Sequence, residues 1–182
     1  MRHYNKAHRH RSKELKPSWR GEYEITDTIR LMMQKGYKIG YSIIDGWWFD
    51  TGKKDDILQV NSIILDETIK REIRGEVIDS RIDGRVTIME DTKVVNSTIR
   101  GPCIVGKNCL IENSYIGPYT SIGDNARIIE SSIEYSIVLK GATIEGIDRL
   151  EESLIGENTK LIKSHRRNAI KLHIGDYSEV IL

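Results

Sequence analysis

The stretch that decides the fold is IGPYTSIGDNARI, residues 116–128. Its branched apolar residues Ile116, Ile122 and Ile128 are six positions apart, and a small residue follows four positions after each of the first two. An amphipathic helix would place apolar residues every three to four positions, and a half-buried strand every two. A period of six instead predicts a solenoid whose short strands turn inward once per hexad, as in a parallel β-helix.

The same pattern, a branched apolar residue followed four positions later by a small one, recurs less regularly on both sides of this stretch. Val105 with Cys109, Val138 with Ala142, and Ile155 with Thr159 repeat it. With about 18 residues in each three-sided turn, Val77 to Lys163 is long enough for about five coils. The positions next to these inward apolar residues should point outward. They hold Ile129, Tyr135, Ile137 and Leu139, which we take as candidate packing surfaces for a second copy.

Composition excludes several functional classes. The 182 residues carry a formal net charge of +1, which gives no global attraction to nucleic acid or to an anionic membrane. No stretch approaches the roughly 20 apolar residues needed to cross a bilayer, and the start does not resemble a signal peptide, so a cytoplasmic location is expected.

Cys103 and Cys109 are expected to fill the solenoid core; a disulfide or half of a metal site are the alternatives.

The residues before the solenoid have a different character. Residues 1–16 are basic and without period, and we expect a disordered head rather than a nucleic-acid arm or a metal tract. Residues 17–65 predict a helix from Thr26 or Asp27 to Lys35 and strands over 37–44 and 47–49. A second helix is expected with Asp55 or Asp56 as its cap and an apolar face that contains Ile57, Val60, Ile64 and Leu65. Four such elements are too few to bury their own apolar surface, so they indicate a piece of a domain. Residues 169–182 alternate like a strand that closes the solenoid.

Two motifs carry a family resemblance. LKPSWRGEYEITD (15–27) followed by GWWFDTG (46–52) closely resembles the sugar-1-phosphate nucleotidylyltransferases, and KLHIGDYSEV (171–180) resembles the tail of the long form of glucose-1-phosphate thymidylyltransferase. The resemblance covers residues 17–182. It implies a mainly β fold, in which a small α/β remnant of the nucleotidyltransferase domain (17–70) precedes a left-handed parallel β-helix with a C-terminal capping strand (77–182).

The resemblance also implies a chemistry and its residues. In the family, an oxygen of a sugar-1-phosphate attacks the α-phosphorus of a nucleoside triphosphate and pyrophosphate leaves, with Mg²⁺ and cationic side chains stabilising the phosphoryl charge. The Asp of the aromatic-Asp-Thr-Gly motif is one of two carboxylates that hold Mg²⁺, and this role maps onto Asp50. The Gly-Glu-x-Glu-Ile-Thr-Asp segment lies by the sugar pocket, so Glu22 and Glu24 are the expected sugar ligands.

The departures from the family pattern are equally informative. The family's catalytic domain opens with a glycine-rich loop followed by Arg-Leu-x-Pro, and neither this loop nor the second metal carboxylate has a counterpart in the sequence. The basic head does not resemble the family. We therefore expect the chain by itself to be inactive and to hold no cofactor tightly. It would be the C-terminal part of such an enzyme: a truncated reading frame, an artificial fragment or a degenerate gene copy.

Three other readings of the same residues remain open. Asp50-Thr51-Gly52 is also the tripeptide of aspartic proteases, but a helix is expected directly after it and no flap-like hairpin is evident. A hexapeptide-repeat acyltransferase is the main alternative, with His165 in its basic turn as the candidate base and His173 in a structural position. The third reading is an oligomerisation module, and by family analogy a homotrimer is expected.

Overall fold

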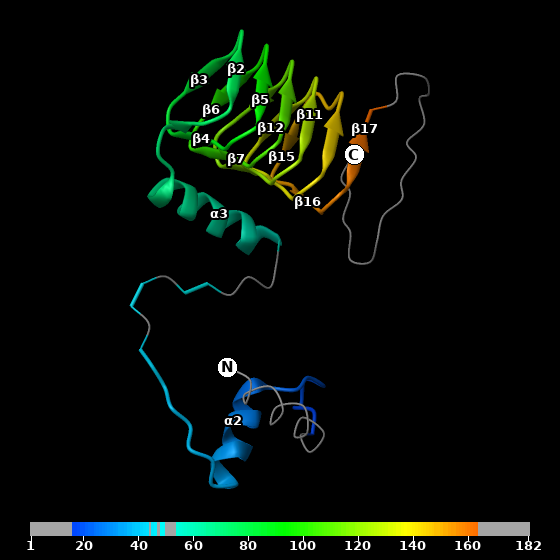
Figure 1. Ribbon diagram of the computed structural model, residues 1–182. Helices are drawn as coiled ribbons and strands as arrows, with labels where there is room; N and C mark the ends of the chain where they lie inside the picture. Colours follow the sequence, from blue (N-terminus) through cyan, green and yellow to red (C-terminus); the bar gives the residue numbers. More distant parts are fainter. Residues whose placement is uncertain (1–15, 44, 47, 50–53, 164–182) are drawn as a thin grey trace. The chain divides into compact units, whose positions relative to one another are not determined.

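The computed structural model describes residues 16–43, 45–46, 48–49 and 54–163. The chain divides into two compact units, Met1–Trp47 and Trp48–Leu182, and each is described here by itself. The first unit contains the helix α2 (Ile25–Gln34), and the second contains the helix α3 (Lys54–Thr68) and all strands (Figure 1).

The first unit is built around α2. The helix begins after Glu24, which has an extended backbone and whose carbonyl oxygen accepts the Thr28 amide, and it ends before Gly36 at φ +77°. It therefore starts slightly earlier than the expected Thr26 or Asp27. None of its side chains is buried. The strands expected over 37–44 and 47–49 are not found in the described residues of those segments, 37–43 and 48–49.

The second unit is a three-sided solenoid of parallel strands, which confirms the predicted mainly β fold with a parallel β-helix of about five coils. Sheet A contains β1 (Glu72–Ile73), β4 (Val86–Ile88), β7 (Cys103–Val105), β10 (Thr120–Ile122), β13 (Ile137–Val138) and β16 (Leu154–Ile155). Sheet B contains β2 (Glu76–Ile78), β5 (Lys93–Val95), β8 (Leu110–Glu112), β11 (Arg127–Ile129), β14 (Thr143–Glu145) and β17 (Lys160–Ile162). Sheet C contains β3 (Arg81–Asp83), β6 (Thr98–Arg100), β9 (Tyr115–Ile116), β12 (Ser132–Glu134) and β15 (Leu150–Glu151). Pairing begins at Glu72, before the expected Val77.

The coils are shorter than the expected 18 residues. Leu110 pairs with Arg127, 17 residues further on, and Arg127 pairs with Thr143, 16 residues further on. The missing residue lies between sheets B and C. Along one coil the buried small residues are Cys103, Cys109, Ser114 and Thr120, so the intervals are six, five and six. This coil therefore contains one five-residue interval, and the 16-residue coil contains a second one, from Ser131 to Ser136.

A ladder of serines explains the five-residue interval. Ser80, Ser97, Ser114 and Ser131 occupy the corner between sheets B and C in successive coils. Each hydroxyl donates to the carbonyl oxygen two residues before it, for example from Ser114 to Glu112 at 2.7 Å. The serine hydroxyl oxygen itself accepts the backbone N–H of the residue at the same corner of the next coil, for example from Ser131 to Oγ of Ser114 at 3.1 Å. The serine thus replaces the backbone partner that a longer turn would supply.

Left-handed backbone at this corner makes the tight turn possible. The residue before each serine has positive φ: Asp79, Asn96, Asn113 and Glu130. Asn and Asp adopt this conformation at lower cost than other side chains because they bond locally to the backbone. Asn96 also donates through its side-chain amide to Oδ1 of Asn113 at 2.6 Å, which links neighbouring coils.

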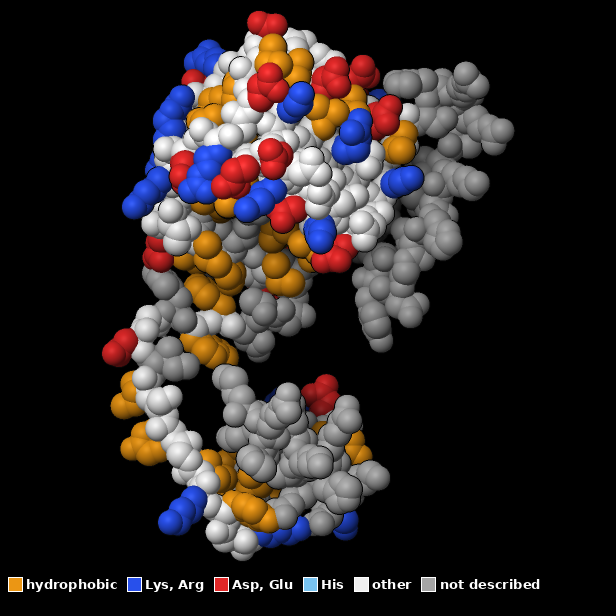
Figure 2. All heavy atoms as spheres, in the orientation of Figure 1, with side chains coloured by type: hydrophobic (Ala, Val, Ile, Leu, Met, Phe, Trp, Pro, Cys, Tyr) orange, Lys and Arg blue, Asp and Glu red, His pale blue; other side chains and the backbone are white. Residues whose placement is uncertain are grey.

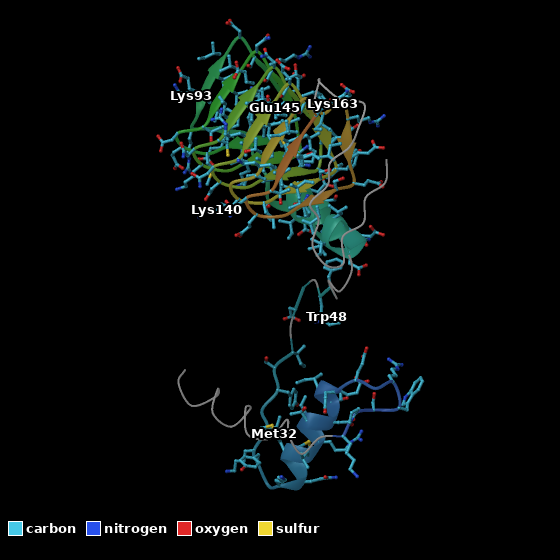
Figure 3. The ribbon with its side chains drawn as sticks, turned by 90° about the vertical axis from the view of Figure 1, so that its right-hand side faces the viewer. Met32, Trp48, Lys93, Lys140, Glu145 and Lys163 are labelled. Atoms are coloured by element: carbon cyan, nitrogen blue, oxygen red, sulfur yellow. The ribbon has the colours of Figure 1, made fainter. Side chains whose placement is uncertain are left out.

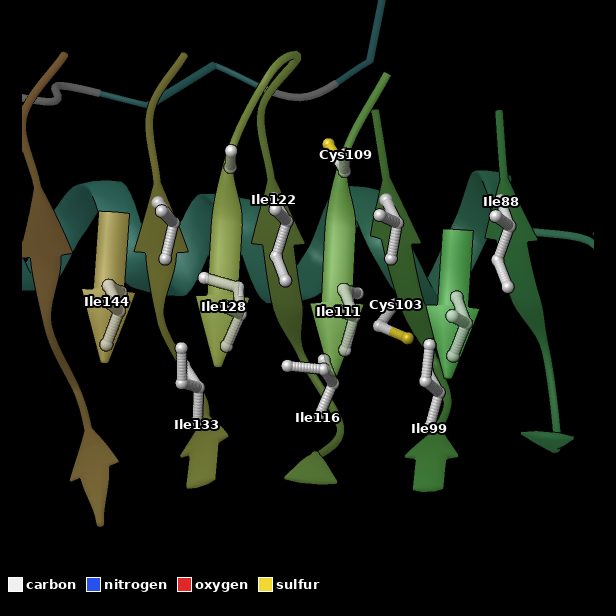
Figure 4. Close-up of a cluster of buried hydrophobic side chains, with 14 of the residues drawn as sticks. Ile88, Ile99, Cys103, Cys109, Ile111, Ile116, Ile122, Ile128, Ile133 and Ile144 are labelled. Carbon is white, nitrogen blue, oxygen red and sulfur yellow. The ribbon is translucent and has the colours of Figure 1, made fainter. Parts of the chain in front are cut away.

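The core is a stack of branched apolar side chains directed inward from all three sheets (Figure 4). The centre of each strand in sheets B and C supplies one residue per coil, such as Ile111, Ile128 and Ile144 from sheet B. Cys103 and Cys109 are buried and free in this stack, which confirms that they fill the core. Ile129, Tyr135, Ile137 and Leu139 lie outside it, half-buried or exposed, as predicted.

The helix α3 covers the outer surface of sheet A. The Asn61 side-chain amide donates to the Tyr119 carbonyl oxygen at 2.9 Å, and its Oδ1 accepts from the Ser121 hydroxyl at 2.5 Å. At the C-terminal end of the helix, Thr87 donates to the carbonyl oxygen of Lys70 at 2.9 Å. The helix therefore packs against the solenoid within one compact unit.

The buried side of α3 differs from the predicted one. Leu65 and Ile69 are buried, whereas Ile64, which was expected on the same apolar face, is 52% exposed. The side facing sheet A is partly polar because the outer surface of that sheet presents hydroxyl and carbonyl groups to it. Asp55 and Asp56 lie in the first turn of the helix rather than at its cap.

Candidate functional site

The two predicted sugar ligands lie on the turn that leads into α2. Two backbone bonds close this turn, from the Ser18 amide to the Glu22 carbonyl oxygen and from the Gly21 amide to the Ser18 carbonyl oxygen, both at 2.8 Å. The Ser18 hydroxyl donates to Oε1 of Glu24 at 3.2 Å, which orients that carboxylate. The Glu22 side chain is exposed and Glu24 is half-buried. Both carboxylates are thus positioned by the same short turn and keep free acceptor capacity.

The other predicted site residues are not described. Asp50, the expected Mg²⁺ ligand, and His165, the alternative acyltransferase base, both lie outside the described residues. The same holds for His173, the basic head and the expected closing strand. All five histidines of the sequence fall in these segments, so the described solenoid holds no imidazole base.

Metal binding can be tested only on the described part of the chain. There, no group of three or more Asp, Glu, His or Cys side chains is arranged to hold a metal ion.

Acidic and basic residues alternate along the corner between sheets A and B. Successive coils place Glu90, Lys107, Asp124, Lys140 and Glu157 at one position, and backbone bonds from the residues that follow them join these coils. Figure 3 shows the Lys140 side chain on the outside of the rod. This charged ladder was not predicted, because its period is the coil length and not the hexad.

Glu90 is the most perturbed carboxylate of the described chain. Its own backbone N–H, and then the Arg74 guanidinium at 2.7 Å, lower the pKa of Glu90 to about 2. Its second oxygen, Oε2, is enclosed and lies 3.4 Å from Nζ of Lys107. These bonds favour the ionised form, so Glu90 is a structural anion and not a proton donor near neutral pH.

The cysteine thiols are chemically quiet. Burial raises the pKa of Cys103 to about 12, and it also raises the pKa of Cys109. A thiol becomes nucleophilic only when it loses its proton, so neither residue is suited to covalent catalysis.

Sheet C carries two open hollows on its outer surface. One, of about 650 Å³, is lined by Arg81, Arg100 and Tyr115 among others. The other, of about 550 Å³, adjoins it along Thr98 and Tyr115 and is lined further by polar residues of the serine corner. Arg81, Thr98 and Tyr115 stand one above another because each is separated by one 17-residue coil. In the sequence, the 17-residue interval between these three residues is the one feature that could have predicted this surface.

Comparison with known proteins identifies the sequence more closely. Residues 3–67 match the family model described as nucleotidyl transferase. The match includes most of the basic head, so our expectation that the head is unrelated to the family is wrong. The basic composition of the head gave no sign of the family, because the match depends on the residue at each position and not on the overall content of basic residues. No helix among the described residues is long and apolar enough to span a membrane.

Individual relatives cover both units of the chain. A glucose-1-phosphate thymidylyltransferase of Streptomyces antibioticus is 44% identical over 91% of this chain and 47% of its own length. That of Streptomyces griseus is 40% identical over 89% of this chain and 46% of its own length. A bifunctional sugar-1-phosphate nucleotidylyltransferase/acetyltransferase of Sulfurisphaera tokodaii is 35% identical over 78% of this chain and 36% of its own length.

The chain spans about half the length of the two thymidylyltransferases it matches. The same relatives match both the first unit and the solenoid. This continuous match confirms the resemblance found in the two N-terminal motifs. The chain is therefore homologous, over about nine-tenths of its length, to about half of a glucose-1-phosphate thymidylyltransferase of the sugar-1-phosphate nucleotidyltransferase family.

Proposed function

We propose that this chain is the C-terminal portion of a sugar-1-phosphate nucleotidylyltransferase of the glucose-1-phosphate thymidylyltransferase type. The observation that carries the proposal is the continuous similarity, at 44% identity, across 91% of the chain. The state of the first unit supports it. Trp19 is 90% exposed and Tyr23 64% exposed, and α2 buries no side chain, as expected for part of a larger catalytic domain.

The proposed reaction joins a nucleoside triphosphate to a sugar-1-phosphate. An oxygen of the sugar phosphate forms a bond to the α-phosphorus, the bond from that phosphorus to the bridging oxygen breaks, and pyrophosphate leaves. In this scheme Glu22 and Glu24 accept hydrogen bonds from sugar hydroxyls. The turn closed by Ser18 and Gly21 supports this role, because it holds two acceptors close together without using their full capacity.

Mg²⁺ is proposed only for the whole enzyme. Asp50 would supply one oxygen ligand, and a hard cation needs several in a fixed arrangement. When bound, the metal would neutralise charge on the phosphoryl oxygens. The chain by itself is accordingly expected to bind Mg²⁺ weakly and to lack turnover. The proposed substrates, a nucleoside triphosphate and a sugar-1-phosphate, also favour a cytoplasmic location.

The solenoid is proposed to serve assembly. Its core is closed and its described residues hold neither a histidine nor a metal cluster, so a structural role suits it best. We propose that the chain forms a homo-oligomer through the β-helix, for which the family resemblance implies a trimer. We propose neither a nucleic acid nor a membrane as a partner, given the net charge of +1.

A fusion protein tests the proposed activity. The half of the Streptomyces antibioticus relative that this chain does not match would be joined to its N-terminus, and pyrophosphate release would be measured with Mg²⁺, dTTP or UTP, and glucose-1-phosphate. We expect turnover from the fusion and none from the 182-residue chain. Asp50→Asn should abolish it, whereas the control Asp45→Asn, at an exposed residue, should not. Turnover by the chain alone, or a folded but inactive fusion, would contradict the proposal.

Acyl transfer is the second candidate, because one relative is bifunctional by name. It would use His165 as a general base toward an amine or hydroxyl, with acetyl-coenzyme A as donor. Release of free coenzyme A from acetyl-coenzyme A in the presence of an amine or hydroxyl acceptor, with the acetyl group recovered on that acceptor, would favour this activity over a purely structural solenoid. The activity should be lost in His165→Ala and kept in His173→Ala.

A further inference from the structure

The outer surface of sheet B carries two columns of side chains with different chemistry. The first residues of its strands form a basic column: Glu76, Lys93, Leu110, Arg127, Thr143 and Lys160. The third residues form an apolar and acidic column: Ile78, Val95, Glu112, Ile129, Glu145 and Ile162. Adjacent strands are about 4.8 Å apart, so each column is a straight row along the rod.

Of the other two faces of the solenoid, one is covered by a helix and the other pairs charged side chains within itself. Sheet A is covered by α3 through Asn61. Sheet C neutralises charges within itself: Arg81 pairs with Asp83 at 2.7 Å, and Arg149 pairs with Glu134 and Glu151 at 3.1 and 2.5 Å. Among the described residues, no helix covers sheet B, and apolar side chains lie among acidic and basic ones on the surface of the rod (Figure 2).

The charges of sheet B are largely unpaired. Lys93 pairs with Glu76 at 3.3 Å, but Glu112, Arg127 and Glu145 form no ion pair with any described residue. Between them lie exposed or half-buried apolar residues, including Ile78 at 38% and Ile162 at 51% exposed. A surface of this composition is suited to a partner that brings the opposite charges in the same order.

We propose that this partner is a second copy of the chain, packed on sheet B about a twofold axis parallel to the rod; this inference rests on the proposed assembly role. The twofold places the basic column of each copy against the acidic column of the other. Glu112 then lies between the partner's Lys93 and the partner's Arg127, one coil above and one coil below it. Glu145 lies in the same way between the partner's Arg127 and the partner's Lys160.

The alternation of levels gives this arrangement its specificity. Cations occupy the second, fourth and sixth strands of the sheet, and the two glutamates occupy the third and fifth. Each glutamate therefore meets two cations across the interface. A twofold axis perpendicular to the rod would instead place the basic column against itself, and like charges across an interface are costly. The charge pattern thus selects parallel rods and a dimer, in contrast to the trimer that the resemblance implies.

Mass in solution tests the proposal. For the full 182-residue chain, sedimentation equilibrium over a range of concentrations should give a dimer. Glu112→Lys/Glu145→Lys should raise its dissociation constant by about 100-fold or more, because like charges then meet on both sides of the twofold. The control Glu67→Lys/Glu152→Lys makes the same change in net charge at exposed residues outside sheet B and should leave the dimer intact. Circular dichroism and thermal unfolding would establish that both variants are folded.

A charge reversal completes the test. Adding Lys93→Glu, Arg127→Glu and Lys160→Glu to the weakened variant should restore the dimer, because the two columns are then complementary again. Failure of rescue in a folded protein, or equal weakening by the control, would overturn the proposed face. A trimer would overturn it while leaving the assembly role in place, and a monomeric wild-type chain would overturn both.

Discussion

Replacing Ser114 by alanine tests the account of the solenoid corner most directly. The hydroxyl donates to the carbonyl oxygen of Glu112 at 2.7 Å and accepts the backbone N–H of Ser131 at 3.1 Å. In the variant the Glu112 oxygen still accepts the Glu130 amide at 3.0 Å, so only the Ser131 N–H loses its partner. A buried donor without an acceptor costs about 1–3 kcal/mol. We therefore expect the free energy of unfolding to fall by about 2 kcal/mol.

Urea denaturation followed by circular dichroism measures this loss at a fixed protein concentration. Ser132→Ala is the matched control, because Ser132 is half-buried and its hydroxyl forms no hydrogen bond with any described residue. Its effect should stay within about 0.5 kcal/mol. Amide exchange of Ser131 should also become faster in Ser114→Ala. A loss no larger than that of Ser132→Ala, with unchanged exchange, would refute the role of the serine ladder.

Three further predictions concern the core, the helix and the charged corner. Ile116→Ala, at a residue with no exposed surface, should cost about 2–5 kcal/mol in urea denaturation, whereas Leu139→Ala removes as many carbons from a 38% exposed residue and should cost about 1 kcal/mol or less. Asn61→Ala removes both polar contacts to sheet A and should lower stability by about 1–2 kcal/mol, and an unchanged midpoint would contradict the docking of α3. Because the pKa of Glu90 is lowered to about 2, the stability it provides is complete above its unfolded pKa of about 4.3 and is lost as pH falls toward 2. Thermal unfolding from pH 6 to pH 2 should show a smaller acid-induced loss in Glu90→Gln than in the wild type; equal pH profiles would refute this assignment.

The sequence by itself determined which residues turn inward. Ile116, Ile122 and Ile128 gave the six-residue beat, and all three are buried in the structure. Inward and outward positions follow from the local backbone, because successive side chains of a strand point to opposite faces. The family followed from two short motifs near the N-terminus, and the comparisons confirm it. Glu22 and Glu24 remain predictions as sugar ligands, as does Asp50 as a metal ligand.

Only the tertiary structure decided which polar residues become neighbours. That depends on the coil offset, which is 16 or 17 residues from Glu76 onward. The serine corner, where a side-chain hydroxyl replaces one residue of the turn, accounts for one residue of the difference from 18. The 17-residue offset brings Lys107 beside Glu90, and the two columns of sheet B continue through the 16-residue step from Arg127 to Thr143. The docking of α3 has the same origin. Asn61 meets Tyr119, 58 residues away, because the coils bring the Tyr119 carbonyl oxygen to a surface that no local pattern reveals.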